Sequence, residues 1–291
     1  LTGTVSVAVA AAVSKVNILS TFTYDNVPPV SSIGVPLPGK YYNSLATLFG
    51  AGYDGVLLST MSLSIQKVSG NCYNPSDNLF GAACPNWFKA QGSVGSWTYT
   101  FATQPWQSTE QYIVYSSATD MASNAQTAVS SSSFYYDVYQ PTAAIISPVN
   151  GGYMNASQGA STGTVTDYPG ADIASLLVAL SSSSAGAANT WWTGTAFTGL
   201  NADSNYTSTT SYVSGVQLST WAWLRPSAME TGKTYRMRVK ATDLAIPTAN
   251  WREFDYTFTY DAVKPTATIT SPVNGSYQNA PFTVMGSTND Y

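Results

Sequence analysis

The feature that most constrains the fold of this chain is an internal repeat. A Phe-x-Tyr-Asp motif occurs three times and ends at Asp25, Asp137 and Asp261. Each copy is followed by a proline and then by a Gly-x-Tyr-x-Asn motif, which begins at residues 39, 151 and 275. The copies lie 112 and 124 residues apart, which is the length of a small domain and not of a solenoid repeat. The sequence therefore predicts independent domains in tandem.

The interiors of the two complete copies also match. Trp97 in the first copy corresponds to Trp221 in the second, and a segment ending in Ala-Thr-Asp follows each of them. We predict the terminal strand or strands of a preceding repeat (1–28), two full repeats (29–140 and 141–264) and the first strands of a following repeat (265–291). We interpret the incomplete repeats at both ends as a sign that the sequence is part of a longer protein. The alternative is that loose end strands complete a neighbouring molecule by strand donation.

Several short segments alternate apolar and polar residues, as half-buried strands do. The alternation is clearest in residues 235–242 and recurs in 60–65, 176–180 and 266–270. About seven such strands per repeat, separated by Pro, Gly and Asn-Gly turns, predict an all-β fold of tandem immunoglobulin-like β-sandwich domains. Because aromatic side chains bury the largest areas, the expected core residues are Trp97, Trp221, Tyr112 and Tyr235.

The composition argues against catalysis. The chain has no histidine, so the usual general base of serine and cysteine hydrolases is missing. Its glutamates, Glu110, Glu230 and Glu253, have no companion motif for paired-carboxylate chemistry. No Gly-rich phosphate loop is present either. We expect a protein that is not an enzyme and has no organic cofactor.

The chain is almost uncharged. Charged residues make up 9% of it and the net charge is −4, against about 25% charged residues in a typical soluble domain. This balance gives no electrostatic basis for a nucleic-acid partner. The longest apolar stretch, residues 5–13, is far shorter than the roughly 20 residues of a membrane helix and is interpreted as a strand.

The two cysteines, Cys72 and Cys84, lie 12 residues apart in a stretch rich in Asn, Pro and Gly. A disulfide between them would stabilise the fold by roughly 3 kcal/mol through loop closure. Two thiols without a histidine cannot complete a structural zinc shell. We predict a disulfide, and the alternative is a pair of buried free thiols.

Taken together, the motifs resemble the bacterial immunoglobulin-like (Big-type) tandem repeats of very large secreted and cell-surface proteins. The resemblance rests on Pro-x-Ala-x-Ile-x-Ser-Pro-Val-Asn-Gly at residues 141–151 and 265–275, on Gly-Thr-Val-Thr-Asp at 163–167, and on Ala-Thr-Asp at 118–120 and 241–243. The first repeat departs from this pattern at residues 35–39 and in its cysteine loop, which replaces the segment 191–194. The resemblance implies an extracellular or cell-surface protein.

The resemblance also implies that calcium stiffens the joints between repeats. Asp25, Asp137 and Asp261 recur at the joints, and Asp120 and Asp243 follow at matching positions. Calcium takes six to eight oxygen ligands, of which one or two carboxylates per joint supply only part. The competing interpretation is that each joint aspartate caps a turn by accepting a hydrogen bond from the nearby backbone.

We interpret the chain as a non-catalytic structural repeat segment of a giant extracellular protein that forms a stalk, sheath or fibre, an adhesin-like spacer. Its low charge would allow self-association into a filament or array through uncharged polar side chains. The alternative is a carbohydrate-binding accessory module on a surface protein. Its glycan ligand would stack on Trp106, Trp191, Trp192 and Trp251.

Overall fold

The computed structural model describes residues 21–93, 95–167, 172–183, 190–200, 202–209, 213 and 218–290. The chain divides into two compact units: unit 1 is Leu1–Val138 with Ala245–Thr248, and unit 2 is Tyr139–Leu244 with Ala249–Tyr291. The described residues form strands and turns and contain no helix. Residues 1–20 of the expected preceding repeat, including the expected strand at 5–13, lie outside the described residues.

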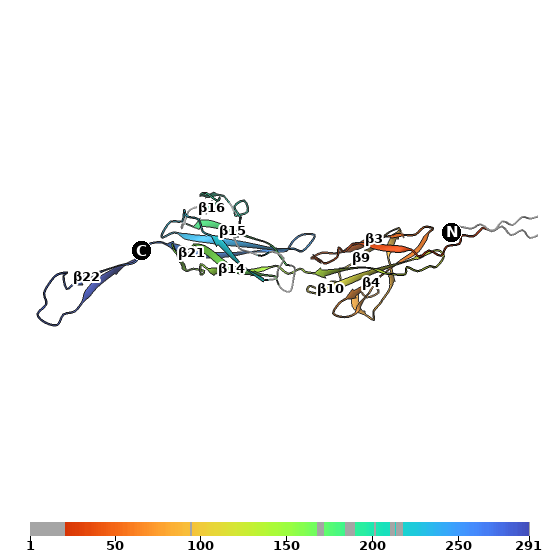
Figure 1. The fold of residues 1–291 in the computed structure, drawn as a ribbon, viewed down its shortest axis with the longest axis horizontal. Helices are drawn as coiled ribbons and strands as arrows, with labels where there is room; N and C mark the ends of the chain where they lie inside the picture. Colours follow the sequence, from red (N-terminus) through yellow and green to blue (C-terminus); the bar gives the residue numbers. More distant parts are fainter. Residues whose placement is uncertain are drawn as a thin grey trace, which may run out of the picture. The chain divides into compact units, whose positions relative to one another are not determined.

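Unit 1 consists of two sheets around a hydrophobic core (Figure 1). The smaller sheet has the order β1-β3-β9-β8, formed by Val30–Val35, Thr47–Tyr53, Ser96–Thr100 and Gln91–Ser93. The larger sheet has the order β2-β11-β10-β4-β5-β6, with β7 paired to β4. These strands are Lys40–Tyr42, Ser130–Tyr136, Gln111–Asp120, Leu58–Lys67, Cys72–Asn74, Leu79–Ala82 and Phe88–Lys89.

Unit 2 has the corresponding two sheets. The smaller has the order β12-β14-β19, formed by Thr142–Ser147, Ala160–Thr166 and Leu218–Leu224. The larger has the order β13-β21-β20-β15-β16-β17, with β18 paired to β15. These strands are Tyr153–Asn155, Trp251–Asp261, Thr234–Asp243, Ile173–Ser183, Thr190–Trp192, Phe197–Gly199 and Thr207–Ser208. The fold is therefore the predicted tandem of all-β sandwiches. More than seven strands form in each unit because short strands of four residues or fewer extend the sheets.

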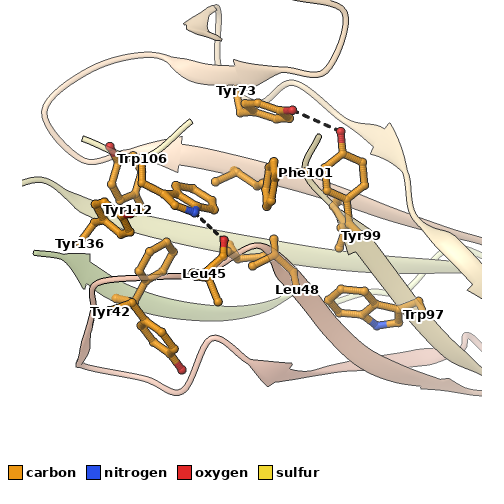
Figure 2. Packing of buried hydrophobic residues seen from close by; sticks show 14 of the residues in the cluster. Tyr42, Leu45, Leu48, Tyr73, Trp97, Tyr99, Phe101, Trp106, Tyr112 and Tyr136 are labelled. Carbon is orange, nitrogen blue, oxygen red and sulfur yellow. Dashed lines mark hydrogen bonds between the residues drawn. The ribbon is translucent and has the colours of Figure 1, made fainter. Parts of the chain in front are cut away.

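The cores contain the side chains that the alternation predicts. Strands β10 and β20 alternate buried and more exposed residues along their whole length. The four expected core aromatics, Trp97, Trp221, Tyr112 and Tyr235, are all buried. In unit 1 the core is largely aromatic (Figure 2), and the polar edges of its rings are hydrogen bonded, as where the Trp106 indole N–H donates to the Leu45 carbonyl over 2.7 Å. These expectations from the sequence are confirmed.

The Gly-x-Tyr-x-Asn motif marks the start of the first strand of each larger sheet. Gly39, Gly151 and Gly275 all have φ near +70° to +80°, a backbone region that favours glycine. The Gly39 N–H donates to the Ser133 carbonyl and the Gly151 N–H to the Thr257 carbonyl, each over 2.7 Å. The glycine thus turns the chain and joins it to the neighbouring strand.

The last hairpin departs from the sequence expectation. Strands β22 (Thr266–Ser271) and β23 (Met285–Asn289) pair with each other in a two-stranded sheet. The alternation at 266–270 predicts a half-buried strand, but Ile269 is 70% exposed, whereas the corresponding Ile145 is 5% exposed. The expectation is wrong for these residues because no second sheet of described residues covers the hairpin.

Candidate cation site

Two of the three joint aspartates, Asp25 and Asp261, cap turns. Asp25 Oδ1 accepts a hydrogen bond from the Val27 N–H over 3.0 Å, and Asp261 Oδ1 accepts one from the Val263 N–H over 2.9 Å. In both cases the partner lies two residues further along the chain, which is the geometry of an Asx turn. Asp25 and Asp261 therefore fit the turn interpretation. Because each cap uses only Oδ1, Oδ2 of each carboxylate could still bind a cation.

Asp25 does not stand alone in unit 1. Asp25, Asp54 and Asp120 each place one carboxylate oxygen within 4.8 Å of the others. Asp54 follows β3 and Asp120 is the last residue of β10. Because Asp25 lies in the segment that leads into β1, this acidic trio joins that segment to two loops of the sandwich.

Each member of the acidic trio is held in place by hydrogen bonds. Asp120 is buried, and its two oxygens accept bonds from the backbone N–H and the side-chain amide of Asn124 over 2.8 and 2.7 Å. The same Asn124 amide donates to the Asp25 carbonyl over 3.1 Å. Asp54 Oδ2 accepts from the Val56 N–H over 2.9 Å. The carboxylates therefore converge on a preformed geometry.

The trio has the properties expected of a site for a hard cation. Asp54 Oδ1 is buried and has no hydrogen-bond partner among the described residues, a state that costs free energy unless a ligand satisfies the oxygen. At an effective dielectric constant near 20, two like charges this close repel by about 3 kcal/mol per pair. Calcium prefers oxygen ligands of this kind. The donor set fits calcium, with the remaining ligands supplied by carbonyls or water.

Sequence reasoning missed Asp54. It lies four residues after Gly50, just as Asp167 lies four residues after Gly163 and Asp290 lies four residues after Gly286. The sequence did contain a signal for Asp54. Asp167 ends the Gly-Thr-Val-Thr-Asp motif, and the same spacing from a glycine marks Asp54 as its equivalent in the first repeat. Asp54, Asp167 and Asp290 thus recur at equivalent positions of the three copies, as the joint aspartates do.

Unit 2 contains a related arrangement. Asp167 and Asp243 are both buried and place carboxylate oxygens within 4.8 Å of each other. Asp243 accepts from the backbone N–H and the side-chain amide of Asn250, each over 2.8 Å, as Asp120 does from Asn124 in unit 1. Asp137, at the end of unit 1, is buried and donates its N–H to the Tyr42 carbonyl. Calcium at Asp25, Asp137 and Asp261 stays a prediction.

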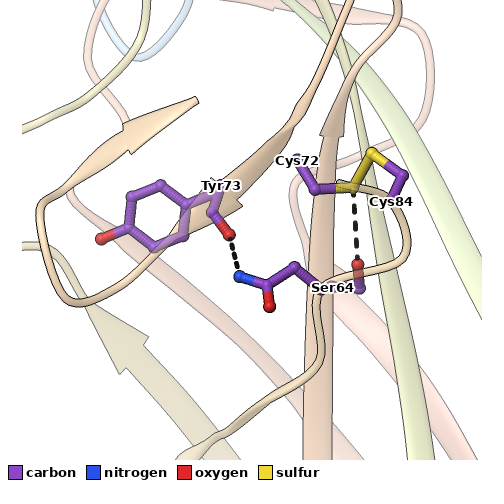
Figure 3. Close-up of a disulfide and its surroundings, with 5 residues drawn as sticks. Ser64, Cys72, Tyr73 and Cys84 are labelled. Atoms are coloured by element: carbon purple, nitrogen blue, oxygen red, sulfur yellow. Dashed lines mark hydrogen bonds between the residues drawn. A yellow bond between two sulfur atoms is a disulfide. The ribbon is translucent and has the colours of Figure 1, made fainter. Parts of the chain in front are cut away.

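Cys72 and Cys84 form a disulfide in unit 1 (Figure 3). Cys72 begins β5, so the bridge fastens the segment after β6 to the outer side of the larger sheet. Ser64 lies beneath it, with its hydroxyl 3.9 Å from the Cys72 sulfur. The neighbouring Asn86 amide donates to the Tyr73 carbonyl over 2.8 Å. The loop is therefore fixed both at the bridge and at Asn86, two residues after Cys84.

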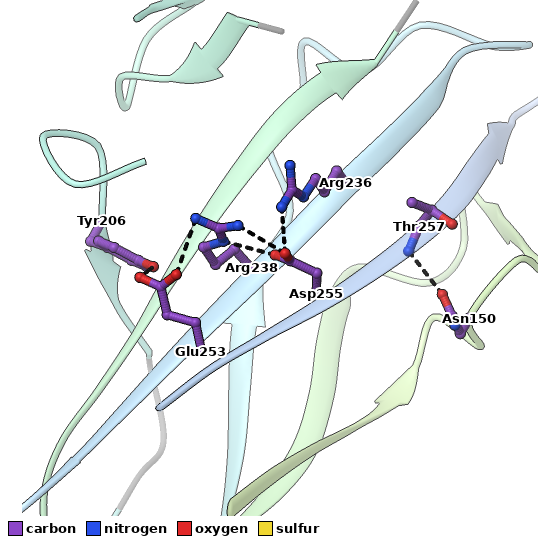
Figure 4. A network of polar contacts seen from close by, with 7 residues as sticks. All are labelled: Asn150, Tyr206, Arg236, Arg238, Glu253, Asp255 and Thr257. Atoms are coloured by element: carbon purple, nitrogen blue, oxygen red, sulfur yellow. Dashed lines mark hydrogen bonds and ion pairs between the residues drawn. The ribbon is translucent and has the colours of Figure 1, made fainter. Parts of the chain in front are cut away.

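Two of the basic residues of unit 2, Arg236 and Arg238, are neutralised within their own sheet (Figure 4). Arg238 donates from Nε and one terminal nitrogen to Asp255, each over 2.8 Å, and contacts Glu253 at 3.1 Å. Arg236 also pairs with Asp255. The Tyr206 hydroxyl completes the network by donating to Glu253 over 2.7 Å. These cations hold neighbouring strands together and do not present a free basic face.

The glutamates occupy ion pairs. Glu110 pairs with Lys67 at 3.3 Å, and Glu230 pairs with Lys233 at 2.8 Å. A hydrogen bond from Ser69, together with Lys67, lowers the pKa of Glu110 below its usual value. A general acid requires a raised pKa, so the environment of Glu110 opposes that role.

Two of the tryptophans considered for sugar stacking are unavailable. Trp106 and Trp191 are buried, Trp106 in the core of unit 1 and Trp191 against Ala179 and Ala202 in unit 2. Trp192 packs partly against the core of unit 2, beside Phe197. Trp251 is half exposed, but the Lys240 ammonium lies 4.4 Å from its ring centre. The expectation that Trp106 and Trp191 stack on a sugar is wrong because both rings are buried, and sequence alone does not distinguish a core indole from an exposed one.

No helix among the described residues is long and apolar enough to cross a membrane. No protein-family model matches the chain, and no curated protein sequence matches it. Among solved structures it is similar to fibronectin(III)-like modules of Clostridium thermocellum CbhA, at 10% identity over 80% of this chain and 95% of that one, with a TM-score of 0.35.

The chain is also similar to a tetra-tandem repeat in the extending region of a large adhesion protein. The identity is 15% over 86% of this chain, the TM-score is 0.31, and 53% of that chain is covered, so this chain spans about half of it. A third similarity is to dimeric latent PorU from Porphyromonas gingivalis, at 13% identity over 88% of this chain and 27% of that one, with a TM-score of 0.24. At these values the similarities carry no functional argument.

Proposed function

We propose that the chain is a non-catalytic structural segment of a giant extracellular protein, built from bacterial immunoglobulin-like repeats whose joints are fixed by calcium. It serves as a spacer in a stalk, sheath or fibre. The observation that supports this most is the acidic trio of unit 1. A cation bound by Asp25, Asp54 and Asp120 would tie the segment that enters the sandwich to two of its loops. The direction in which the chain enters the unit would then be fixed.

Other features agree with this role. Disulfides persist in oxidising compartments such as the extracellular space, and the chain contains one. The charged side chains are few, and several of them are paired with one another. Lateral contacts between copies would therefore meet little electrostatic repulsion. The partners that suit such a weakly charged surface are a second copy of the chain or a neutral ligand on a cell surface.

The calcium part of the proposal predicts opposite effects of one substitution under two conditions. Asp54→Asn keeps an oxygen for the Val56 N–H but removes one of three converging charges. In chelator the variant should unfold at a higher temperature than the wild type, because the repulsion is relieved. In millimolar calcium the wild type should gain at least about 4 °C, and the variant should lose most of this gain.

Asp77→Asn is the matched control. Asp77 also caps a turn, accepting from the Leu79 N–H over 3.0 Å, but it lies outside the acidic trio. Its substitution should change the unfolding temperature equally with and without calcium. Differential scanning calorimetry of the three proteins, each in chelator and in calcium, measures these shifts. Identical wild-type transitions in chelator and calcium would remove the cation from the proposal.

A further inference from the structure

The outer side of the larger sheet of unit 1 contains a pocket of about 310 Å³. This is near the lower end of the range of about 300 to 1,000 Å³ found for small-molecule sites. Its lining includes Gln66, Tyr115, Trp87 and the disulfide. The pocket shares no residue with the acidic trio or with the hydrophobic core cluster. The proposed spacer function does not use it.

The pocket is built from rigid parts. Ser64 of β4 and Tyr115 of β10 are cross-strand partners, so the floor is a paired sheet. The disulfide covers Ser64 and holds the loop that ends in Trp87. The Asn86 amide donates to the Tyr73 carbonyl and so fixes the residue before Trp87. A preformed pocket loses little conformational entropy when it binds a ligand.

The lining is neutral and has unused hydrogen-bonding groups. None of the described residues that line the pocket carries a carboxylate, ammonium or guanidinium group. Within the described part of the chain, the Trp87 indole N–H, the Gln66 amide and the Tyr115 hydroxyl have no hydrogen-bond partner. By contrast, four other indoles donate to partners inside their units, those of Trp97, Trp106, Trp221 and Trp223. Trp87 is 41% exposed, so its ring is accessible from solvent.

The corresponding place in unit 2 is already filled. Tyr115 and Arg238 each lie five residues before the aspartate of their Ala-Thr-Asp motif. The Arg238 guanidinium lies 5.8 Å from the ring centre of Trp191 and is held by Asp255 and Glu253. Unit 2 therefore supplies its own charged group beneath an indole. Unit 1 has neither the arginine nor the carboxylates, so its pocket suits a neutral ligand from outside.

We propose that this pocket binds one neutral hexopyranose residue of a glycan. A pyranose has a flat face of C–H groups, which matches the apolar face of an indole, and hydroxyl groups around its rim. The Gln66 amide and the Tyr115 hydroxyl can both donate to and accept from those hydroxyls. The absence of cations in the lining selects against acidic sugars. The chain thus combines a spacer with a weak surface-binding site in one of its two units.

The test is saturation-transfer difference NMR on the intact oxidised chain with neutral methyl hexopyranosides of gluco, galacto and manno configuration. At least one should give a signal that falls about tenfold in Trp87→Ala, which corresponds to about 1.4 kcal/mol. Trp87→Phe keeps a flat ring and should retain part of the signal. Trp251→Ala removes an indole of similar exposure from unit 2 and should leave the signal unchanged. The thermal transition of each variant shows that it is folded.

Two comparison ligands sharpen the result. Glucuronic acid should bind more weakly than the neutral glycosides because no cation lines the pocket. Cyclohexanol has a similar ring but a single hydroxyl, so it should also bind more weakly. The proposal is overturned if no neutral glycoside gives a signal, if Trp87→Ala binds as the wild type does, or if cyclohexanol binds best. The last outcome would identify a site for an apolar side chain.

Discussion

At the scale of single residues, each unit depends on a glycine packed beneath a tryptophan. Gly50 of β3 lies under Trp97, and Gly163 of β14 lies under Trp221. A Cβ atom at Gly50 would overlap both the Ser32 carbonyl oxygen and the Trp97 ring, and one at Gly163 would overlap the Ala144 carbonyl oxygen and the Trp221 ring. The absence of a side chain therefore lets the indole lie flat on the sheet.

Gly50→Ala should destabilise unit 1 by about 3 kcal/mol or more, because the clash involves backbone that cannot move aside without breaking the β1–β3 pairing. Gly81→Ala is the matched control: it also lies on a strand of unit 1, but nothing surrounds its added methyl group within 4 Å. Urea unfolding of both variants measures the difference. Equal stabilities would show that Trp97 adapts to the extra carbon.

At the scale of elements, strands β20 and β21 are joined by ion pairs as well as by their backbone. Burial alone would raise the pKa of Asp255, but hydrogen bonds from Arg238 and Arg236 outweigh it and lower the pKa to about 2. The carboxylate is therefore more acidic in the folded chain than in the unfolded one. Its contribution to stability is complete above about pH 4 and is lost as the pH falls toward 2.

Asp255→Asn should lower the free energy of unfolding of unit 2 by about 1 kcal/mol at neutral pH, a figure reduced for the partial solvent exposure of the pair. The gap between variant and wild type should close as the pH falls from about 4 to 2. Glu230→Gln, which breaks the exposed pair with Lys233, should show a much smaller gap. Denaturant unfolding between pH 7 and pH 2 measures the stability of both variants and of the wild type. A stability difference between Asp255→Asn and the wild type that does not change with pH would contradict a lowered pKa of Asp255.

The elements also show what the sequence could predict. Strands with one buried face were predictable because apolar residues recur at every second position, as in β4 and β20. The acidic trio was not, because Asp25, Asp54 and Asp120 come from three distant segments and only the fold brings them together. The pocket beside Trp87 was missed because unit 2 has no equivalent of this tryptophan. Repeat comparison finds shared residues and overlooks those that make one unit different.

At the scale of the whole molecule, the central claim is that each unit folds as a separate sandwich whose role is mechanical. Each of the two units has its own hydrophobic core cluster, one around Trp97 and one around Trp221. The chain should therefore resist extension in two separate steps. The disulfide, which lies in unit 1 alone, gives those steps different lengths because it withholds the residues between Cys72 and Cys84 from extension.

Single-molecule force spectroscopy of the chain tests this claim most directly. We expect two unfolding events, each releasing roughly 350–400 Å of chain, with the event of unit 1 the shorter under oxidising conditions. Reduction of the disulfide should lengthen that event alone by about 40 Å, and calcium should raise the force at which it occurs. One event that releases the whole chain, or extension without resistance, would contradict the account.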